Sequence, residues 1–252
     1  MKKILVIANW KCNHVTLKEA KKLFNSIVRG IKKIKGVEVV ICPPFVYLQS
    51  LNPKPYTLNP KIGAQNCFWE EKGPFTGEIS PKMLKNLGCE YVIVGHSERE
   101  RYFGETDEMT NKKIKAAISA GLKPILCIGE TEKELGSKKY ELGKVKKYLK
   151  KQLENNLKGI PNSLFQIPDS LIVAYEPVWA VGTGKPCGIS EAREANLFIK
   201  GIIKNVPILY GGSVNSENAA GYIKEAKFDG LLIGGASLNP KEFVEIVKNC
   251  SY

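Results

Sequence analysis

The segment SLIVAYEPVWAVGTGK, residues 170–185, joins an apolar run, one carboxylate and a loop of small residues. Ser170 to Ala174 predict a buried parallel strand, because apolar residues follow one another without alternating with polar ones. Pro177 cannot donate to a strand ladder and favours an extended backbone before it, so the strand should stop at Glu176. The segment therefore predicts a carboxylate at a strand end under a glycine-containing loop, which suits proton abstraction. A strand end followed by a plain surface loop is the alternative.

The same layout of strand and following loop recurs eight times. Amphipathic stretches of helical period lie between the strands, as in Leu17–Ile34, Thr106–Ala120 and Ser190–Lys204. Alternating strands and helices predict an α/β protein with a parallel sheet, and eight such units in 252 residues fit a closed (β/α)8 barrel. The expected strands are Ile4–Ala8, Val37–Cys42, Lys61–Gln65, Glu90–Val94, Lys123–Cys127, Ser170–Ala174, Val206–Tyr210 and Gly230–Ile233.

A doubly wound open sheet is the competing architecture. Such sheets usually have fewer strands, and no Gly-x-Gly-x-x-Gly motif follows the first expected strand. No Ser/Gly-rich linker or low-complexity tract divides the chain. We therefore expect residues 1–252 to form a single barrel domain.

Composition limits the possible functions. The chain is 43% hydrophobic, yet no apolar run approaches the length of a membrane span. The apolar run that follows Met1 is too short for a signal peptide and is interrupted at Asn9. The seven cysteines are scattered singly and form no Cys-x-x-Cys pair. This usage fits a reducing, cytoplasmic location and argues against a disulfide framework or a zinc site.

The formal net charge of +13 raises the possibility of nucleic-acid binding. However, nine lysines fall within Lys133–Lys158, where glutamates are interleaved with them. A solvated outer helix explains that region better, so we expect neither a nucleic-acid nor a membrane partner. The excess positive charge would still attract a small anionic substrate.

Polar residues follow the first and fourth expected strands. Asn9 and Lys11 are two residues apart, and in extended chain their side chains point to the same side, into the barrel mouth. His96 follows the fourth strand, just before an expected helix start, where the helix dipole disfavours imidazolium. Together with Glu176, these residues would place a base, a neutral acid and a cation on one rim. Taken singly, Lys11 could be a surface lysine and His96 a structural histidine.

Glycine pairs follow the last two expected strands, in Tyr210–Ser213 and in Gly234–Ser237. Glycines let backbone N–H groups approach an anion, and loops after strands seven and eight of such barrels often hold phosphate. No cluster of histidines, cysteines and carboxylates suggests a metal. The rim therefore predicts proton transfer beside a carbonyl group of a small phosphorylated sugar, without metal or cofactor.

The chain resembles the triosephosphate isomerases from end to end. Several matching runs are long enough to be specific, and they occur in the family's order. They are Asn9–Lys11, Ala64–Asn66, Phe75–Glu78, Tyr91–Arg99, Cys127–Glu130, the stretch around Glu176, Tyr210–Ser213 and Ile233–Ala236.

The resemblance implies interconversion of D-glyceraldehyde 3-phosphate and dihydroxyacetone phosphate in glycolysis and gluconeogenesis. Glu176 matches the family's base, His96 the neutral electrophile, and Lys11, beside Asn9, the cation that stabilises the enediolate. Glu98 matches the carboxylate that pairs with this lysine. The phosphate site is matched by Gly182, Ser213, Gly234 and Gly235, with Asn9 and Lys11 beside it, and the lid by Pro177–Lys185.

The resemblance also implies a homodimer. The loop Asn66–Glu78 matches one that enters a pocket of the partner, where Thr76 would approach Asn9 and Glu78 would approach Arg99. Cys12 matches a position that packs against this loop. The aromatic residues of the loop should not remain in water, so the sequence itself gives weaker support for a dimer. A loop folded back on its own barrel is the alternative.

Two positions depart from the family pattern, Glu100 where an arginine is common and Pro186 near the end of the lid. Pro186 fixes its own backbone angle and restricts the residue before it. Two other functions remain open. One is another metal-free phosphate-binding barrel enzyme, such as an aldolase, although a Schiff-base lysine would be expected deeper in the barrel than Lys11. The other is a basic surface-binding protein without catalysis.

Overall fold

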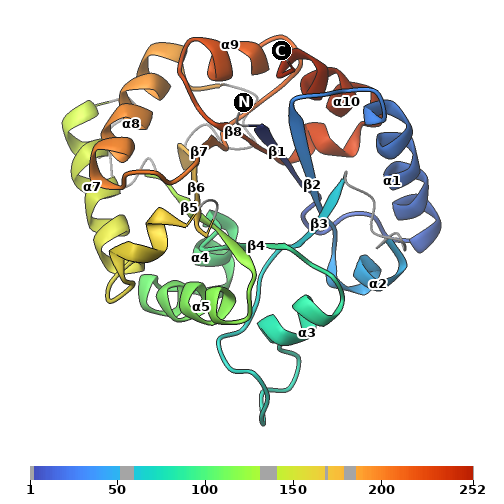
Figure 1. Cartoon of the computed structure of the whole chain (residues 1–252), viewed down its shortest axis with the longest axis horizontal. Coiled ribbons are helices and arrows are strands. Elements are labelled where there is room, and N and C mark those ends of the chain that lie inside the picture. The colour runs from blue at the N-terminus through green and yellow to red at the C-terminus, as the bar shows by residue number, and fades with distance from the viewer. Residues whose placement is uncertain (1–2, 52–59, 131–140, 168–169, 179–185, 252) are drawn as a thin grey trace.

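The computed structural model describes residues 3–51, 60–130, 141–167, 170–178 and 186–251. Eight parallel strands close into a barrel in the order β1 to β8, with β8 pairing back onto β1 (Figure 1). The predicted (β/α)8 barrel is thus confirmed, and the doubly wound alternative is wrong. The strands are β1 Ile4–Asn9, β2 Val37–Cys42, β3 Lys61–Ala64, β4 Tyr91–Val94, β5 Lys123–Ile128, β6 Ile172–Tyr175, β7 Ile208–Tyr210 and β8 Gly230–Ile233.

Helices form a ring around the barrel (Figure 1). Within the described residues, the α-helices are α1 Leu17–Ile31, α2 Leu48–Leu51, α3 Pro81–Asn86, α4 Ser97–Phe103, α5 Asp107–Ser119, α7 Leu142–Asn156, α8 Ile189–Ile202, α9 Ala219–Lys224 and α10 Pro240–Asn249. Short 3-10 helices are η1 Phe45–Tyr47, η2 Asn162–Gln166 and η4 Gly235–Leu238. No described helix is long and apolar enough to cross a membrane.

Two apolar cores hold these layers together. One fills the barrel interior with alternate residues of the strands, such as Leu5 and Ile7 from β1 and Ile172 and Ala174 from β6. The other lies between the outer strand faces and the helices. Because both faces of every strand are buried, the strands read as continuous apolar runs rather than as alternating ones. Fully burying one such leucine or isoleucine contributes roughly 1.5–3 kcal/mol.

Several predicted boundaries shift by one to three residues. β6 begins at Ile172 rather than Ser170, and β7 begins at Ile208 rather than Val206. Pro207 lacks the N–H that a strand ladder needs, which explains the later start of β7. Helix α1 stops at Ile31 rather than Ile34, because the chain turns through Gly36, whose φ is 78°. Apolar periodicity finds the elements, whereas turn geometry sets where they end.

Helix α1 begins with a reciprocal capping box. The Glu19 N–H donates to the Thr16 hydroxyl oxygen at 3.3 Å, and the Thr16 N–H donates to the Glu19 carboxylate at 3.2 Å. These two bonds satisfy amides that the first turn of a helix leaves without partners.

We expect Thr16→Ala to lower the free energy of unfolding by about 1 kcal/mol, because the cap acceptor is lost. Chemical denaturation followed by circular dichroism would measure the change. Thr16→Ser keeps the hydroxyl and serves as the matched control. Equal stability of the alanine and serine variants would contradict the role given to the cap.

Candidate functional site

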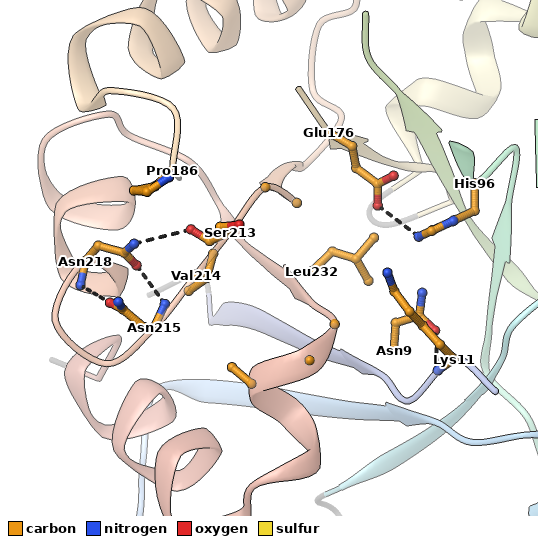
Figure 2. Close-up of a pocket in the computed structure, with 15 residues that line it drawn as sticks. Asn9, Lys11, His96, Glu176, Pro186, Ser213, Val214, Asn215, Asn218 and Leu232 are labelled. Carbon is orange, nitrogen blue, oxygen red and sulfur yellow. Dashed lines mark hydrogen bonds and ion pairs between the residues drawn. The ribbon is translucent and has the colours of Figure 1, made fainter. Parts of the chain in front are cut away.

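A cavity of about 310 Å³ opens where the strands end (Figure 2). Its walls come from the ends of β1, β4, β6, β7 and β8, which a closed parallel barrel brings to one rim. Pro186 adds a wall on the side of α8. Of the predicted site residues, the cavity is lined by Asn9, Lys11, His96, Glu176, Ser213, Gly234 and Gly235.

Two of the predicted site residues, Glu98 and Gly182, and most of the predicted lid are not among these lining residues. Glu98 does not line the cavity, but its carboxylate reaches the Lys11 ammonium. Gly182 lies outside the described residues, as does most of the predicted lid, of which only Pro177 and Val178 are described. The remaining predicted residues, which are far apart in the sequence, converge on one small polar cavity.

The Glu176 carboxylate is almost completely buried, with 2% of the residue exposed. Its Oε1 lies 3.5 Å from the Nε2 of His96, and its Oε2 has no hydrogen-bond partner among the described residues. Gly211 leaves room for this side chain, because a Cβ there would lie 2.7 Å from the Glu176 Cγ. Burial, and secondarily the Glu176 charge, raises the pKa of the neighbouring Cys127 thiol. A carboxylate so placed is ready to accept a proton from a bound molecule.

His96 caps helix α4 with its own ring. The Glu98 N–H donates to the His96 Nδ1 at 3.2 Å, so Nδ1 acts as an acceptor and carries no proton. In the neutral ring, the proton is then on Nε2, which faces Glu176 and the cavity. The helix start predicted after His96 is confirmed at Ser97. The cap thus orients the ring as a hydrogen-bond donor toward the cavity.

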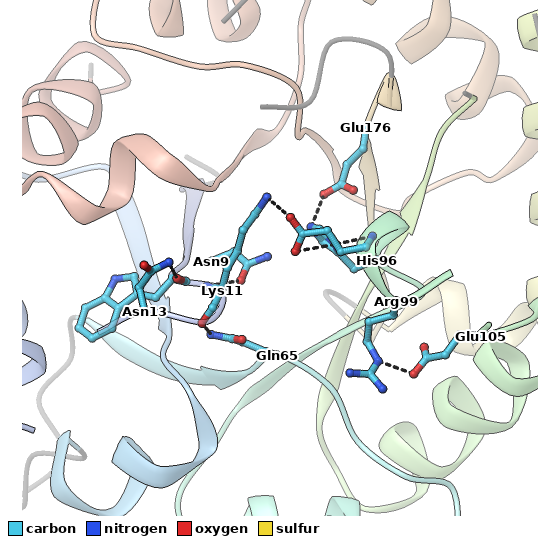
Figure 3. A network of polar contacts seen from close by, with 10 residues as sticks. Asn9, Lys11, Asn13, Gln65, His96, Arg99, Glu105 and Glu176 are labelled. Carbon is cyan, nitrogen blue, oxygen red and sulfur yellow. Dashed lines mark hydrogen bonds and ion pairs between the residues drawn. The ribbon is translucent and has the colours of Figure 1, made fainter. Parts of the chain in front are cut away.

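Lys11 is held in an unusual backbone conformation (Figure 3). Its φ is 54°, in the left-handed region, so the extended geometry expected for Asn9–Lys11 is wrong, although both side chains still line the cavity. The Lys11 N–H donates to the Asn9 Oδ1 at 3.1 Å, and the Gln65 Nε2 donates to the Lys11 carbonyl at 2.9 Å. The Lys11 Nζ lies 2.6 Å from the Glu98 Oε1. Asn9 and Gln65 therefore hold the Lys11 backbone, and Glu98, from helix α4, holds its ammonium.

The opposite end of the cavity is built mainly from backbone. Gly234 and Gly235 form the start of η4, and the Ser237 hydroxyl donates to the Gly234 carbonyl at 2.6 Å. The Ser213 carbonyl accepts a hydrogen bond from the Asn218 Nδ2 at 3.2 Å. The backbone N–H groups of Asn215 and Asn218 each donate to the other residue's side-chain oxygen at 2.9 Å. Amides in such loops are suited to an anion.

Several residues of the site were not predicted from the sequence. Gln65 was noted only as part of a matching run, although its Nε2 bonds both Lys11 and the Cys42 carbonyl. Asn215 and Asn218 line the cavity, and the spacing Asn-x-x-Asn after Ser213 is a turn signal that could have indicated them. Glu100 lies close enough to Cys127 for its charge to raise the pKa of that thiol.

No group of three or more histidine, cysteine or acidic residues suited to a metal ion occurs in the described ranges. The fold and the cavity together define an α/β-barrel enzyme whose cavity, at the carboxyl ends of its strands, holds acid–base side chains and glycine-containing loops suited to an anion.

Comparison with known proteins narrows this class. The triosephosphate isomerase family model matches residues 4–250. The chain is 44% identical to the triosephosphate isomerase of Dehalococcoides mccartyi, covering 100% of this chain and 98% of the relative. It is 43% identical to that of Aquifex aeolicus, covering 96% and 98%. The solved structure of triosephosphate isomerase from Bartonella henselae is similar at a TM-score of 0.83 and 33% identity, covering 98% of each chain. The chain belongs to the triosephosphate isomerase family.

The hydrogen bond from Glu98 to His96 predicts the tautomer of the imidazole. We expect ¹⁵N NMR of histidine-labelled protein at neutral pH to show His96 Nδ1 without a proton and Nε2 with one, because Nδ1 accepts the Glu98 amide. The spectrum of His96→Asn would identify the His96 resonances against those of His14. A protonated Nδ1 would contradict this arrangement.

Proposed function

We propose that this chain interconverts D-glyceraldehyde 3-phosphate and dihydroxyacetone phosphate, the reaction of its family in glycolysis and gluconeogenesis. The observation that carries the proposal is the buried Glu176 carboxylate facing His96 Nε2 across a small cavity that Lys11 also lines. These groups suit the transfer of a proton between two adjacent carbons by way of an enediolate intermediate.

The chemistry follows from the positions of the three groups. Glu176 would remove a proton from the carbon beside the substrate carbonyl, whose oxygen then takes up the electron pair as an enediolate. The His96 Nε2–H would donate a hydrogen bond to that oxygen, and the Lys11 ammonium would offset its charge. Glu176 would then return the proton to the former carbonyl carbon, and His96 would pass the proton of the neighbouring hydroxyl to the enediolate oxygen, so that the neighbouring oxygen becomes the new carbonyl. Asn9 supports Lys11 through its bond to the Lys11 amide.

The substrate phosphate would bind at the backbone-rich end of the cavity. We assign it to Ser213, Gly234 and Gly235, with Gly182 as a further contact from the resemblance alone. Gly234 packs against the Lys11 side chain, since a Cβ there would lie 3.1 Å from the Lys11 Cε. This contact keeps the cation between the phosphate end and the reacting carbons. Glu98 holds the Lys11 ammonium in the same place through their ion pair.

Removing the base tests the assignment. Glu176→Gln should lower kcat about a hundred-fold or more, because general-base catalysis is lost. Inorganic phosphate should still compete with substrate, since its site lies at the other end of the cavity. The measurement is a coupled isomerase assay with a chelator present, which also tests for an unsuspected metal requirement. Near-normal turnover of Glu176→Gln would end the assignment.

We further propose that the protein is a cytoplasmic homodimer and that residues 1–252 form one domain. Large apolar side chains are exposed after each of the strands β1 to β4, namely Val15, Val46, Phe75 and Phe103. The loop Asn66–Glu78 projects from the ring of helices in the same sector (Figure 1). Exposed large apolar side chains that gather on loops of one sector are typical of a protein interface. All seven cysteines are free thiols, as expected in a reducing compartment.

The dimer predicts the effect of a charge on the projecting loop. Thr76→Arg should shift the protein to a monomer in sedimentation at micromolar concentration, with much lower activity, because a cation would enter the partner's cavity rim. Ser163→Arg adds the same charge to an exposed position of η2, outside the β1–β4 sector, and should remain dimeric. A fully active Thr76→Arg monomer would show that the loop does not act on a partner.

A further inference from the structure

A buried glutamine lies behind the catalytic strand end. Gln152 belongs to α7, on the outside of the barrel, and only 4% of it is exposed. Its Oε1 accepts a hydrogen bond from the Gly129 N–H at 2.9 Å. Gly129 is the first residue after β5. Its N–H therefore bonds a side-chain oxygen instead of a backbone carbonyl of a neighbouring strand. A buried amide in this position needs such a partner.

Gly129 in turn is packed against the backbone of Glu176. A Cβ on Gly129 would lie 1.6 Å from the Glu176 carbonyl oxygen, so the two backbones are in direct contact. On either side, the Glu176 N–H donates to the Ile128 carbonyl at 2.7 Å, and the Val178 N–H donates to the Glu130 carbonyl at 3.0 Å. The three residues after Cys127 therefore hold the backbone of the catalytic carboxylate.

Gln152 is itself held in register by contacts between two helices. The Asn156 Nδ2 donates to the Gln152 carbonyl at 2.8 Å and to Oδ1 of Asp107, the first residue of α5, at 2.9 Å. The Asn111 Nδ2 donates to the Asn156 carbonyl at 2.7 Å. These bonds fix the position of α7 along α5. The Gln152 side-chain oxygen is therefore held level with the Gly129 N–H.

We propose that Gln152 is a positioning residue for the isomerisation: its side-chain oxygen fixes the Gly129 peptide, and Gly129 fixes the backbone from which Glu176 reaches the substrate. It touches no reacting atom and acts through Gly129 alone. The inference rests on the proposed role of Glu176 as the base. Since a displacement of about 1 Å can cost a hundred-fold in rate, a small shift of the Gly129 peptide has a measurable effect.

The experiment compares the wild type with Gln152→Leu, which removes the acceptor, and Gln152→Glu, which keeps an acceptor oxygen in the same place. We expect Gln152→Leu to lower kcat at least ten-fold, while KM and the inhibition constant of inorganic phosphate stay within two-fold, because the phosphate end of the cavity belongs to β7 and β8. Gln152→Glu should recover most of the lost kcat. Should the leucine variant not fold, Gln152→Asn withdraws the oxygen by one methylene and should lower kcat in the same way.

Asn155→Leu is the matched control on the same helix. Asn155 donates to Asp107 Oδ2 at 2.8 Å but does not contact Gly129, so this variant should keep wild-type kcat. The proposal is overturned if Gln152→Leu or its asparagine substitute keeps wild-type kcat. It is equally overturned if Asn155→Leu lowers kcat as much as Gln152→Leu does, or if Gln152→Glu has the same low kcat as Gln152→Leu. Weaker phosphate binding by Gln152→Leu, in proportion to its loss of kcat, would also overturn it. An inactive wild type would instead refute the proposed function, which separates the two failures.

Discussion

The burial of one carboxylate is the constraint on which the rest of this molecule depends. Glu176 is almost inaccessible to water, and one of its oxygens has no hydrogen-bond partner among the described residues. Removing a charge from water is costly unless it is paired, and among the described residues the neighbours of this carboxylate are His96, at 3.5 Å, and the Cys127 thiol. Such a carboxylate stays in place only if the surrounding backbone holds it. The barrel supplies that support from both neighbouring strands, β5 and β7.

The same logic applies to the cation across the cavity. A non-glycine residue with a φ of 54° is strained, and Lys11 keeps this conformation because Asn9 and Gln65 bond its amide and its carbonyl. Glu98 then fixes the ammonium, and the neighbouring His96 fixes the amide of Glu98. The proposed base, acid and cation are thus each oriented by neighbours to which no contact with the reacting carbons is assigned. Preorganisation of this kind lets the groups act without rearrangement when charge develops.

The barrel and the rim could be predicted from the sequence because both follow from strand ends. An apolar run that stops at a polar residue is visible at Asn9, at His96 and at Glu176, and parallel strands bring all such ends together. Gln152 could not be found in this way. It lies in a lysine-rich stretch, three residues after Leu149 and beside Leu153, where periodicity only indicates a buried face. Its contact with Gly129 joins residues 23 positions apart and depends on the height of α7 along the barrel. The role of Gln65 could not be predicted either, because the sequence does not show which backbone carbonyl a side-chain amide at a strand end will bond.

Pro186 shows how one wall of the cavity is tied to the loop of Ser213 at the proposed phosphate end. The residue after it, Cys187, is held on both sides: its N–H donates to the Tyr210 hydroxyl at 3.2 Å, and its carbonyl accepts from the Tyr222 hydroxyl at 2.7 Å. The two rings stack at 3.7 Å between centroids, and burial raises the pKa of both phenols, so both remain protonated, with Tyr210 as the acceptor and Tyr222 as the donor. Tyr210 ends β7, and Ser213 follows it at the cavity. Because one strand end anchors both the wall at Pro186 and the loop of Ser213, these two parts of the cavity wall cannot shift independently. Pro186, with its fixed backbone angle, thus lies directly before a residue that neighbouring side chains hold in place.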